Sequence, residues 1–364
     1  MQKTVRKISS KQFMSIFTLG VVAHLVRVLT NNAALAAHQA VWVSVLVSVV
    51  PMALIGWLMI FVAKKFQGYN LAQINVAVFS KPIGTVINII MLLWMVFITA
   101  CNLCLLSERI LFSILPDTSV LFIISAALIA VLLVVMAGME NFAKLSQLLF
   151  YIFISIFVVI SASALFFSFD INNLLPVSTL DTVPVTLGAL QIISVWGSFI
   201  YYFNFCDRIK YEKFEKRALV SLGITAIIGI TIIAVTVGTV GYSMLGNLVL
   251  PFTTVIKNLN SNSIDTFKLF DIALFSIWIM ADVVLVCVSA LIFRSIFATV
   301  FKVKNKNRPV YVLFFIYFIL TLVFESYALK ILNIGQWAVF YVNLSFFFAL
   351  PVILFLTGKL RKKF

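Results

Sequence analysis

Ten long apolar segments, separated by short polar stretches, constrain this chain more than any other feature of its sequence. About 20 apolar residues suffice for a helix to cross the hydrocarbon core of a bilayer. Only 11% of the 364 residues are charged, while a soluble domain carries about a quarter. We therefore predict an all-α integral membrane protein of about ten transmembrane helices. The predicted helices are approximately 11–30, 40–63, 84–107, 119–137, 145–168, 188–205, 217–243, 270–298, 310–328 and 337–357.

The basic residues test this map. If the N-terminus is cytoplasmic, 21 of the 27 Lys and Arg residues fall in cytoplasmic segments. The outer segments hold only Arg109, Lys257, Lys268 and Lys330, and Arg27 and Arg294 lie within spans. Cytoplasmic loops of membrane proteins carry such an excess, and a missed helix would invert it downstream. The pattern predicts ten helices with both termini in the cytoplasm.

Several other function classes are disfavoured. The net charge of +15 lies in short clusters between apolar runs, so we expect contact with lipid and not with nucleic acid. The Cys101-x-x-Cys104 pair lies inside an apolar run and is interpreted as packing residues. Ala34-Leu35-Ala36 resembles a signal cleavage site, but Arg27 interrupts the preceding apolar stretch, which favours a first transmembrane helix. No phosphate loop, nucleophile elbow or metal-ligand cluster is present, so we predict no enzyme and no cofactor.

The eighth segment carries an acidic residue at membrane depth, where charges are costly and mark function or pairing. Asp282 lies about twelve residues into this segment, roughly 18 Å along a helix and hence near the midplane. Helical spacing places Asp271, Trp278 and Ser289 on the same stripe. The stripe predicts either a substrate or cation site, or a structural hydrogen-bond or salt-bridge partner.

The first segment has a matching polar stripe. His24, Arg27 and Asn31 fall on one helical face. Arg27 has two interpretations: it extends to the outer interface, or it pairs with Asp271, Asp282 or a ligand carboxylate. His24 is interpreted as a packing residue, with proton coupling as the alternative.

Single glycines stand at two corresponding places, Gly20 in the first segment and Gly197, after Trp196, in the sixth. Interrupted membrane helices expose backbone groups that bind small charged solutes, and they occur in transporters built from inverted repeats. Five helices per repeat would force opposite orientations. The layout predicts two repeats, approximately 11–168 and 188–357, with the first and sixth helices broken.

Short motifs then follow one another in order along about 300 residues. They are Lys7-Ile8-Ser9 with Gln12-Phe13, Gly68-Tyr69-Asn70-Leu71, Glu108 with Leu115-Pro116-Asp117-Thr118, Gly138-Met139-Glu140 with Ala143-Lys144-Leu145, Asn172-Asn173-Leu174-Leu175-Pro176-Val177, Gly188-Ala189-Leu190, and Leu269-Phe270-Asp271 leading to Trp278. With these motifs the chain resembles the spore germination permeases, the B subunits of Ger-type nutrient germinant receptors.

The resemblance implies a member of the amino acid–polyamine–organocation superfamily with a five-plus-five inverted-repeat fold. In that superfamily the two helix interruptions hold the amino and carboxylate groups of the ligand. Many relatives have a Gly-Glu pair at the second interruption, where this chain has Gly197-Ser198. The departure leaves the ligand class and any ion coupling open. The residues that the resemblance places around the ligand are Thr18, Gly20, Val21, Trp196, Gly197 and Ser198.

The resemblance also implies the function. We predict the B subunit of a spore germinant receptor, which binds a small nutrient, an amino acid, in a midplane pocket. Its implied partners are the receptor A subunit and the lipoprotein C subunit, and its implied location is the spore inner membrane. The alternatives are an amino acid:cation symporter, and an ion-conducting or scaffold subunit of the receptor.

Overall fold

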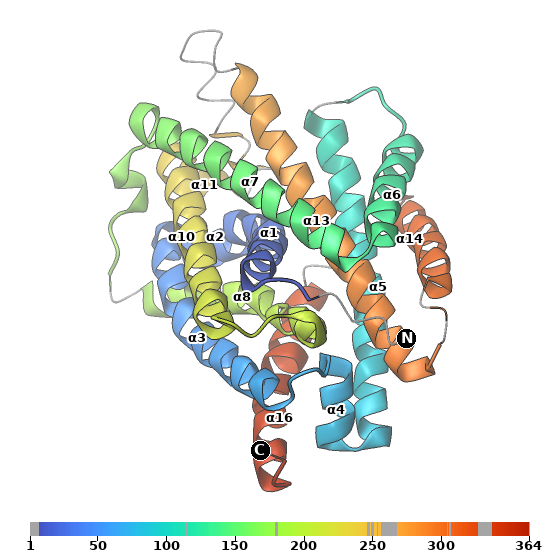
Figure 1. Ribbon diagram of the computed structural model, residues 1–364. Coiled ribbons are helices and arrows are strands. Elements are labelled where there is room, and N and C mark those ends of the chain that lie inside the picture. Colours follow the sequence, from blue (N-terminus) through green and yellow to red (C-terminus); the bar gives the residue numbers. More distant parts are fainter. Residues whose placement is uncertain are drawn as a thin grey trace.

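The computed structural model describes residues 7–113, 115–178, 181–245, 248, 251–252, 254–255, 268–303, 305, 307–326 and 337–363, and this part of the chain is a bundle of helices (Figure 1). The predicted all-α membrane fold is confirmed. Within the described residues, nine helical segments are long and apolar enough to cross a membrane, and the helix at the N-terminus is shorter. Each of the ten predicted spans overlaps a helix.

The main helices are α1 (Ser10–Val28), α3 (Val41–Lys65), α4 (Leu71–Phe79), α5 (Lys81–Ser113), α6 (Val120–Ala137), α7 (Met139–Phe167), α8 (Thr182–Trp196), α10 (Phe214–Val240), α13 (Lys268–Phe301), α14 (Arg308–Ser326) and α16 (Ala349–Leu360). Shorter helical pieces are η1 (Leu29–Ala33), α2 (Ala34–Ala37), η2 (His38–Ala40), η3 (Ile171–Leu174), α9 (Phe199–Tyr202), η5 (Phe203–Arg208), α11 (Tyr242–Leu245) and η7 (Val339–Phe348).

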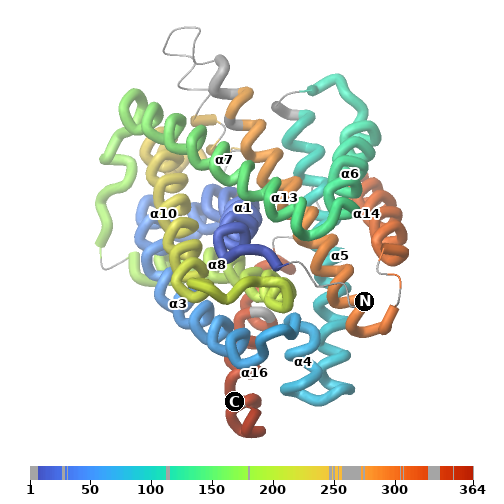
Figure 2. Tube along the Cα trace, in the orientation of Figure 1, coloured from blue at the N-terminus to red at the C-terminus, as the bar shows by residue number. Residues whose placement is uncertain are grey.

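Helix α1 lies in the middle of the bundle, between α7, α8, α10 and α13 (Figures 1 and 2). A capping box fixes its start: the Ser9 side chain accepts from the Gln12 amide, and the Gln12 side chain accepts from the Ser9 amide. The preceding residue, Ile8, exchanges backbone hydrogen bonds with Arg208 and Lys210. The chain that enters α1 is therefore tied to the chain that leaves η5.

The predicted break of the first helix at Gly20 is wrong. Helix α1 runs without interruption from Ser10 to Val28, and the irregular turn follows only afterwards, as the π-helix η1. One glycine costs a helix about 1 kcal/mol relative to alanine, which packing on all sides easily offsets. Gly20 serves another purpose. A Cβ at this position would overlap the hydroxyl of Tyr202, so the glycine allows close approach between α1 and α9.

The predicted break of the sixth helix is confirmed. Helix α8 ends at Trp196, and α9 begins at Phe199. Across the junction the amides of Ser198, Ile200 and Tyr201 bond to carbonyls three residues earlier, which is the tighter 3₁₀ pattern. The helix therefore changes its winding at Gly197 and Ser198 without unfolding, and it continues as η5 to Arg208.

Helix α4 lies between the predicted spans 40–63 and 84–107, in a stretch where the sequence predicted only a connecting loop. It begins with a capping box, in which the Asn70 side chain accepts from the Gln73 amide. At its other end the Arg361 guanidinium donates to the carbonyls of Val78 and Phe79. These contacts fix α4 beside α5 and the end of α16, and the Asn70 amide reaches α13.

Candidate functional site

Three cavities lie one after another along α13. The first is beside Asp282, the second is beside Leu285, Ser289 and Ile292, and the third is beside Arg294 and the residues that follow it. We call them the outer, middle and inner cavities, following the predicted direction of α13 through the membrane. The long helix therefore connects the polar positions that the sequence indicated.

The middle cavity lies at the interruption between α8 and α9. Ser198, Tyr201 and Tyr202 line it from this junction, and His24 lines it from α1. Ser289 contributes from α13, where its hydroxyl donates to the Leu285 carbonyl over 3.0 Å. The rest of the wall is mainly apolar. It consists of Trp94, Met95, Ile98, Leu285, Val288 and Ile292.

Two side-chain contacts and one backbone contact order this wall. The Trp94 indole nitrogen donates to Asn343 Oδ1 over 3.0 Å, which joins α5 to η7. His24 Nε2 lies 3.1 Å from the Asn102 amide nitrogen. Gly197 packs closely against the backbone of η7: a Cβ at this position would lie 3.1 Å from the Asn343 carbonyl oxygen. The π-helical winding of η7 thus packs directly on the interrupted helix.

The middle cavity is small, with a volume of about 30 Å³. This is about the share of volume that one water molecule has in the liquid. An organic ligand would need the walls to move apart. In this conformation the site is therefore assembled but closed.

The outer cavity contains a buried ion pair. The Arg109 guanidinium of α5 lies 2.5 Å from Asp282 Oδ2 of α13, and their side chains are only 12% and 10% exposed. The predicted map of spans counts Arg109 in an outer segment, whereas in the structure it lies within α5 and its side chain is mostly buried in the bundle. Of the two interpretations of Asp282, the geometry favours the salt-bridge partner. His24 lines both this cavity and the middle one.

The other predicted ligand residues do not line the middle cavity as it stands. Thr18 and Val21 are fully buried in the packing of α1, and Trp196 is 2% exposed. Within the described residues, the Thr18 hydroxyl and the Trp196 indole nitrogen have no hydrogen-bond partner. Both groups therefore remain available for a ligand in an opened site. The side chains of Arg27, Asn31 and Asp271 lie outside the described part of the structure.

Sequence reasoning missed several residues of the site. Tyr201, Tyr202 and Trp94 are aromatic residues in apolar runs, and nothing distinguishes them there from packing residues. Asn102 and Asn343 gave a usable signal, since an amide inside an apolar run must find a partner. Their partners come from distant segments, so only the fold identifies them.

Comparisons with known proteins concern the family and the fold of the chain. Residues 7–328 match the family described as spore germination protein. No match is found among curated proteins. Among solved structures, the chain is similar to that of MhsT in complex with L-phenylalanine, with a TM-score of 0.71 and 14% identity over 96% of this chain and 88% of that one. At this identity the likeness concerns the fold.

Proposed function

The chain belongs to the spore germination protein family, and from this premise we propose that it is the B subunit of a nutrient germinant receptor. In this proposal it binds an amino acid in the middle cavity and transmits the signal to an A subunit and a lipoprotein C subunit. We place it in the spore inner membrane with both termini in the cytoplasm. The family and the fold are those of a multi-pass, non-enzymatic membrane permease.

The middle cavity is the observation that carries the proposal. Small-molecule sites combine an apolar wall with a few convergent polar groups. Here Ser198, Ser289, His24 and Asn343 supply the polar groups at a change of helical winding. MhsT, which has a similar fold, was solved in complex with L-phenylalanine. Both observations favour an amino acid with an apolar side chain.

The closed state of the cavity supports a sensing role. A ligand shifts a conformational equilibrium only by its difference in affinity between the states. A cavity with room for about one water molecule has little affinity for an amino acid, and an opened cavity would have more. Nutrient binding would therefore favour the open arrangement of α1, α9, α13 and η7. We propose that the partner subunits respond to this arrangement.

The series of three cavities along α13 favours a second candidate, a working amino acid transporter. The two candidates differ in one measurable property. Uptake of a labelled amino acid by vesicles that contain this chain alone would indicate transport. A nutrient response in spores that depends on the chain, without such uptake, would indicate a receptor subunit.

Narrowing the middle cavity should impair the nutrient response. Ser289 is 3% exposed and faces the cavity, so the branched side chain of Ser289→Val would occupy ligand space. We expect the nutrient concentration for half-maximal germination to rise at least tenfold, which corresponds to about 1.4 kcal/mol of binding free energy. The measurement is a germinant panel on spores in which the gene is deleted and then restored as wild type or variant.

Ser276→Val is the matched control. Ser276 lies on the same helix, donates to the carbonyl four residues earlier as Ser289 does, and is not part of the cavity wall. It should leave the dose response unchanged. Receptor assembly should be equal in both variants. An unchanged dose response in assembled Ser289→Val receptors would contradict binding in the middle cavity.

A further inference from the structure

The inner cavity is the largest of the three, with a volume of about 290 Å³. This volume lies near the lower end of the range of small-molecule sites, about 300–1,000 Å³. Its wall comes from α4, η5, α7 and α13, and it shares no lining residue with the middle cavity. The proposed nutrient site therefore does not account for it.

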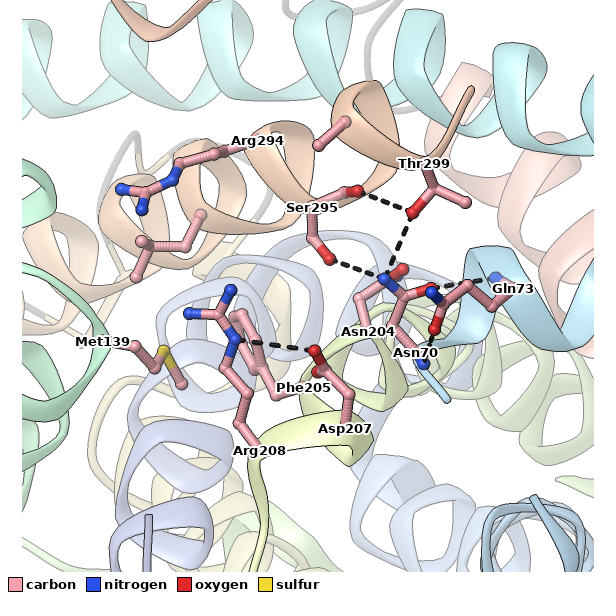
Figure 3. A pocket seen from close by; sticks show the side chains of 12 residues that line it. Asn70, Gln73, Met139, Asn204, Phe205, Asp207, Arg208, Arg294, Ser295 and Thr299 are labelled. Carbon is pink, nitrogen blue, oxygen red and sulfur yellow. Dashed lines mark hydrogen bonds and ion pairs between the residues drawn. The ribbon is translucent and has the colours of Figure 1, made fainter. Parts of the chain in front are cut away.

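Two guanidinium groups line the inner cavity. Arg208 comes from η5 and Arg294 from α13, and Figure 3 shows both guanidinium groups in the left half of the view, with Asn70, Gln73 and Thr299 on the right. Their positive charges act on each other. Among the described residues the wall has one carboxylate, Asp207, whose Oδ2 lies 3.6 Å from the Arg208 Nε. The wall therefore has one more positive than negative charge.

Arg294 is half-buried in a membrane helix. Within the described residues it makes no ion pair or hydrogen bond, and Figure 3 accordingly shows no dashed line from it. Charged groups within membrane helices are costly and usually pair with one another or line a cavity. A bound anion beside Arg294 and Arg208 would remove this cost.

A buried hydrogen-bond acceptor lies in the same wall. Asn204 is 1% exposed, and its amide nitrogen donates to the Tyr201 carbonyl over 3.1 Å. Its Oδ1 has no hydrogen-bond donor among the described residues. The other two amides in the wall have partners: Asn70 Nδ2 donates to Ser295 and Thr299, and Gln73 Oε1 accepts from the Asn70 backbone amide (Figure 3). A buried acceptor without a donor is rare in folded proteins and indicates a ligand that donates.

We propose that the inner cavity binds a small carboxylate that also carries a hydrogen-bond donor. The guanidinium of Arg294, assisted by Arg208, takes the carboxylate, since planar guanidinium groups match carboxylate geometry. Asn204 Oδ1 accepts the hydrogen bond from the donor on the ligand. This second site is separate from the middle cavity. It would let a small carboxylate bind on the predicted cytoplasmic side of the protein.

Two probes that differ by one hydroxyl test the proposal. Glycolate has a carboxylate and a donor, and acetate has the carboxylate alone. Their dissociation constants are measured by calorimetry on the purified full chain in nanodiscs of a neutral lipid, with sodium chloride holding the ionic strength constant. We expect glycolate to bind at least threefold more tightly than acetate, about 0.7 kcal/mol. Equal affinities, or no binding of either probe, would overturn the proposal.

Single substitutions test which side chains bind the carboxylate and which accepts from the donor of the ligand. Arg294→Gln should weaken glycolate binding at least tenfold, and Arg294→Lys should weaken it less, because it keeps the charge. Asn204→Leu should abolish the preference for glycolate over acetate. Lys216→Gln removes one positive charge at an exposed position and should change nothing. If Lys216→Gln matched Arg294→Gln, the effect would be one of net charge and the site would be refuted.

Ser289→Val distinguishes this site from the proposed nutrient site. It alters the middle cavity alone, so glycolate should bind as tightly as to the wild type. Glycolate binding that disappears in Ser289→Val would place the anion in the middle cavity and overturn the proposal. If Ser289→Val left the nutrient response unchanged, the proposed nutrient site would be contradicted, while the proposal of an anion site would still be decided by glycolate binding.

Discussion

Replacing Arg109 with leucine should destabilise the folded chain by about 3–5 kcal/mol, the usual cost of removing one partner of a buried ion pair. The substitution removes the guanidinium that neutralises Asp282, whose side chain is 10% exposed in the outer cavity. Asp282→Leu should cost a similar amount, because it leaves the positive charge of Arg109 inside the bundle. The measurement is the unfolding free energy of each variant in detergent, together with the yield of monodisperse protein.

The double variant Arg109→Leu/Asp282→Leu should recover most of the loss, because an apolar pair of similar volume often replaces a buried ion pair at no cost. The exposed pair Lys64–Glu215 is the matched control, with side chains 49% and 42% exposed. Lys64→Leu should cost less than about 1 kcal/mol, as surface pairs do. If Arg109→Leu cost no more than Lys64→Leu, the buried pair would not stabilise the fold.

The same double variant separates the two interpretations of Asp282. A folded double-leucine receptor that still responds to nutrient would assign the pair to stability. A folded but unresponsive one would assign it to ligand or cation coupling. The single variants cannot decide this, because their loss of stability reduces receptor assembly.

Substituting Gly20 should have the second large effect. Gly20→Ala places a Cβ where the Tyr202 hydroxyl lies. Tyr202 is 2% exposed and packs edge-on against Phe17, with ring centroids 5.3 Å apart, so it has little room to move. We expect a loss of about 1–3 kcal/mol from overpacking and a changed dose response, because Tyr202 lines the middle cavity. Unfolding free energy and germination assays measure the two effects.

Tyr202→Phe removes the hydroxyl that the new methyl group would meet. The double variant Gly20→Ala/Tyr202→Phe should therefore regain much of the lost stability. The rescue should be incomplete, because the ring carbon that bears the hydroxyl would still lie 3.1 Å from the new Cβ. Gly223→Ala is the control, since a Cβ there meets nothing within 4 Å. Equal stability of Gly20→Ala and Gly223→Ala would contradict the close approach.

Parts of the site could be predicted from the sequence. Ser198, His24 and Ser289 all line the middle cavity, and Asp282 lies in the adjoining outer cavity. His24, Ser289 and Asp282 are polar side chains in apolar runs, and a single segment is enough to mark them, whereas Ser198 was implied by the family resemblance. Trp94, Tyr202 and Arg109 could not be assigned in this way. Their roles depend on which helix lies opposite them, and that is decided by packing.

Gly20 and Gly197 likewise show what the sequence can predict and what packing decides. At both positions the sequence predicted an interrupted helix. At Gly197 the winding does change, where η7 packs against the junction. At Gly20 the helix continues, and the missing side chain gives space to Tyr202. A glycine permits both outcomes, and the neighbouring element selects one.

The sequence by itself determined that the chain is an all-α membrane protein with a transporter layout, because bilayer thickness acts on each apolar run separately. It also carried the motifs of the spore germination family. Only the tertiary structure decided that Asp282 pairs with Arg109, that the middle cavity is closed, and that Arg208 and Arg294 share an inner cavity. These contacts join segments distant along the chain, and their geometry depends on how each helix is rotated and packed against its neighbours.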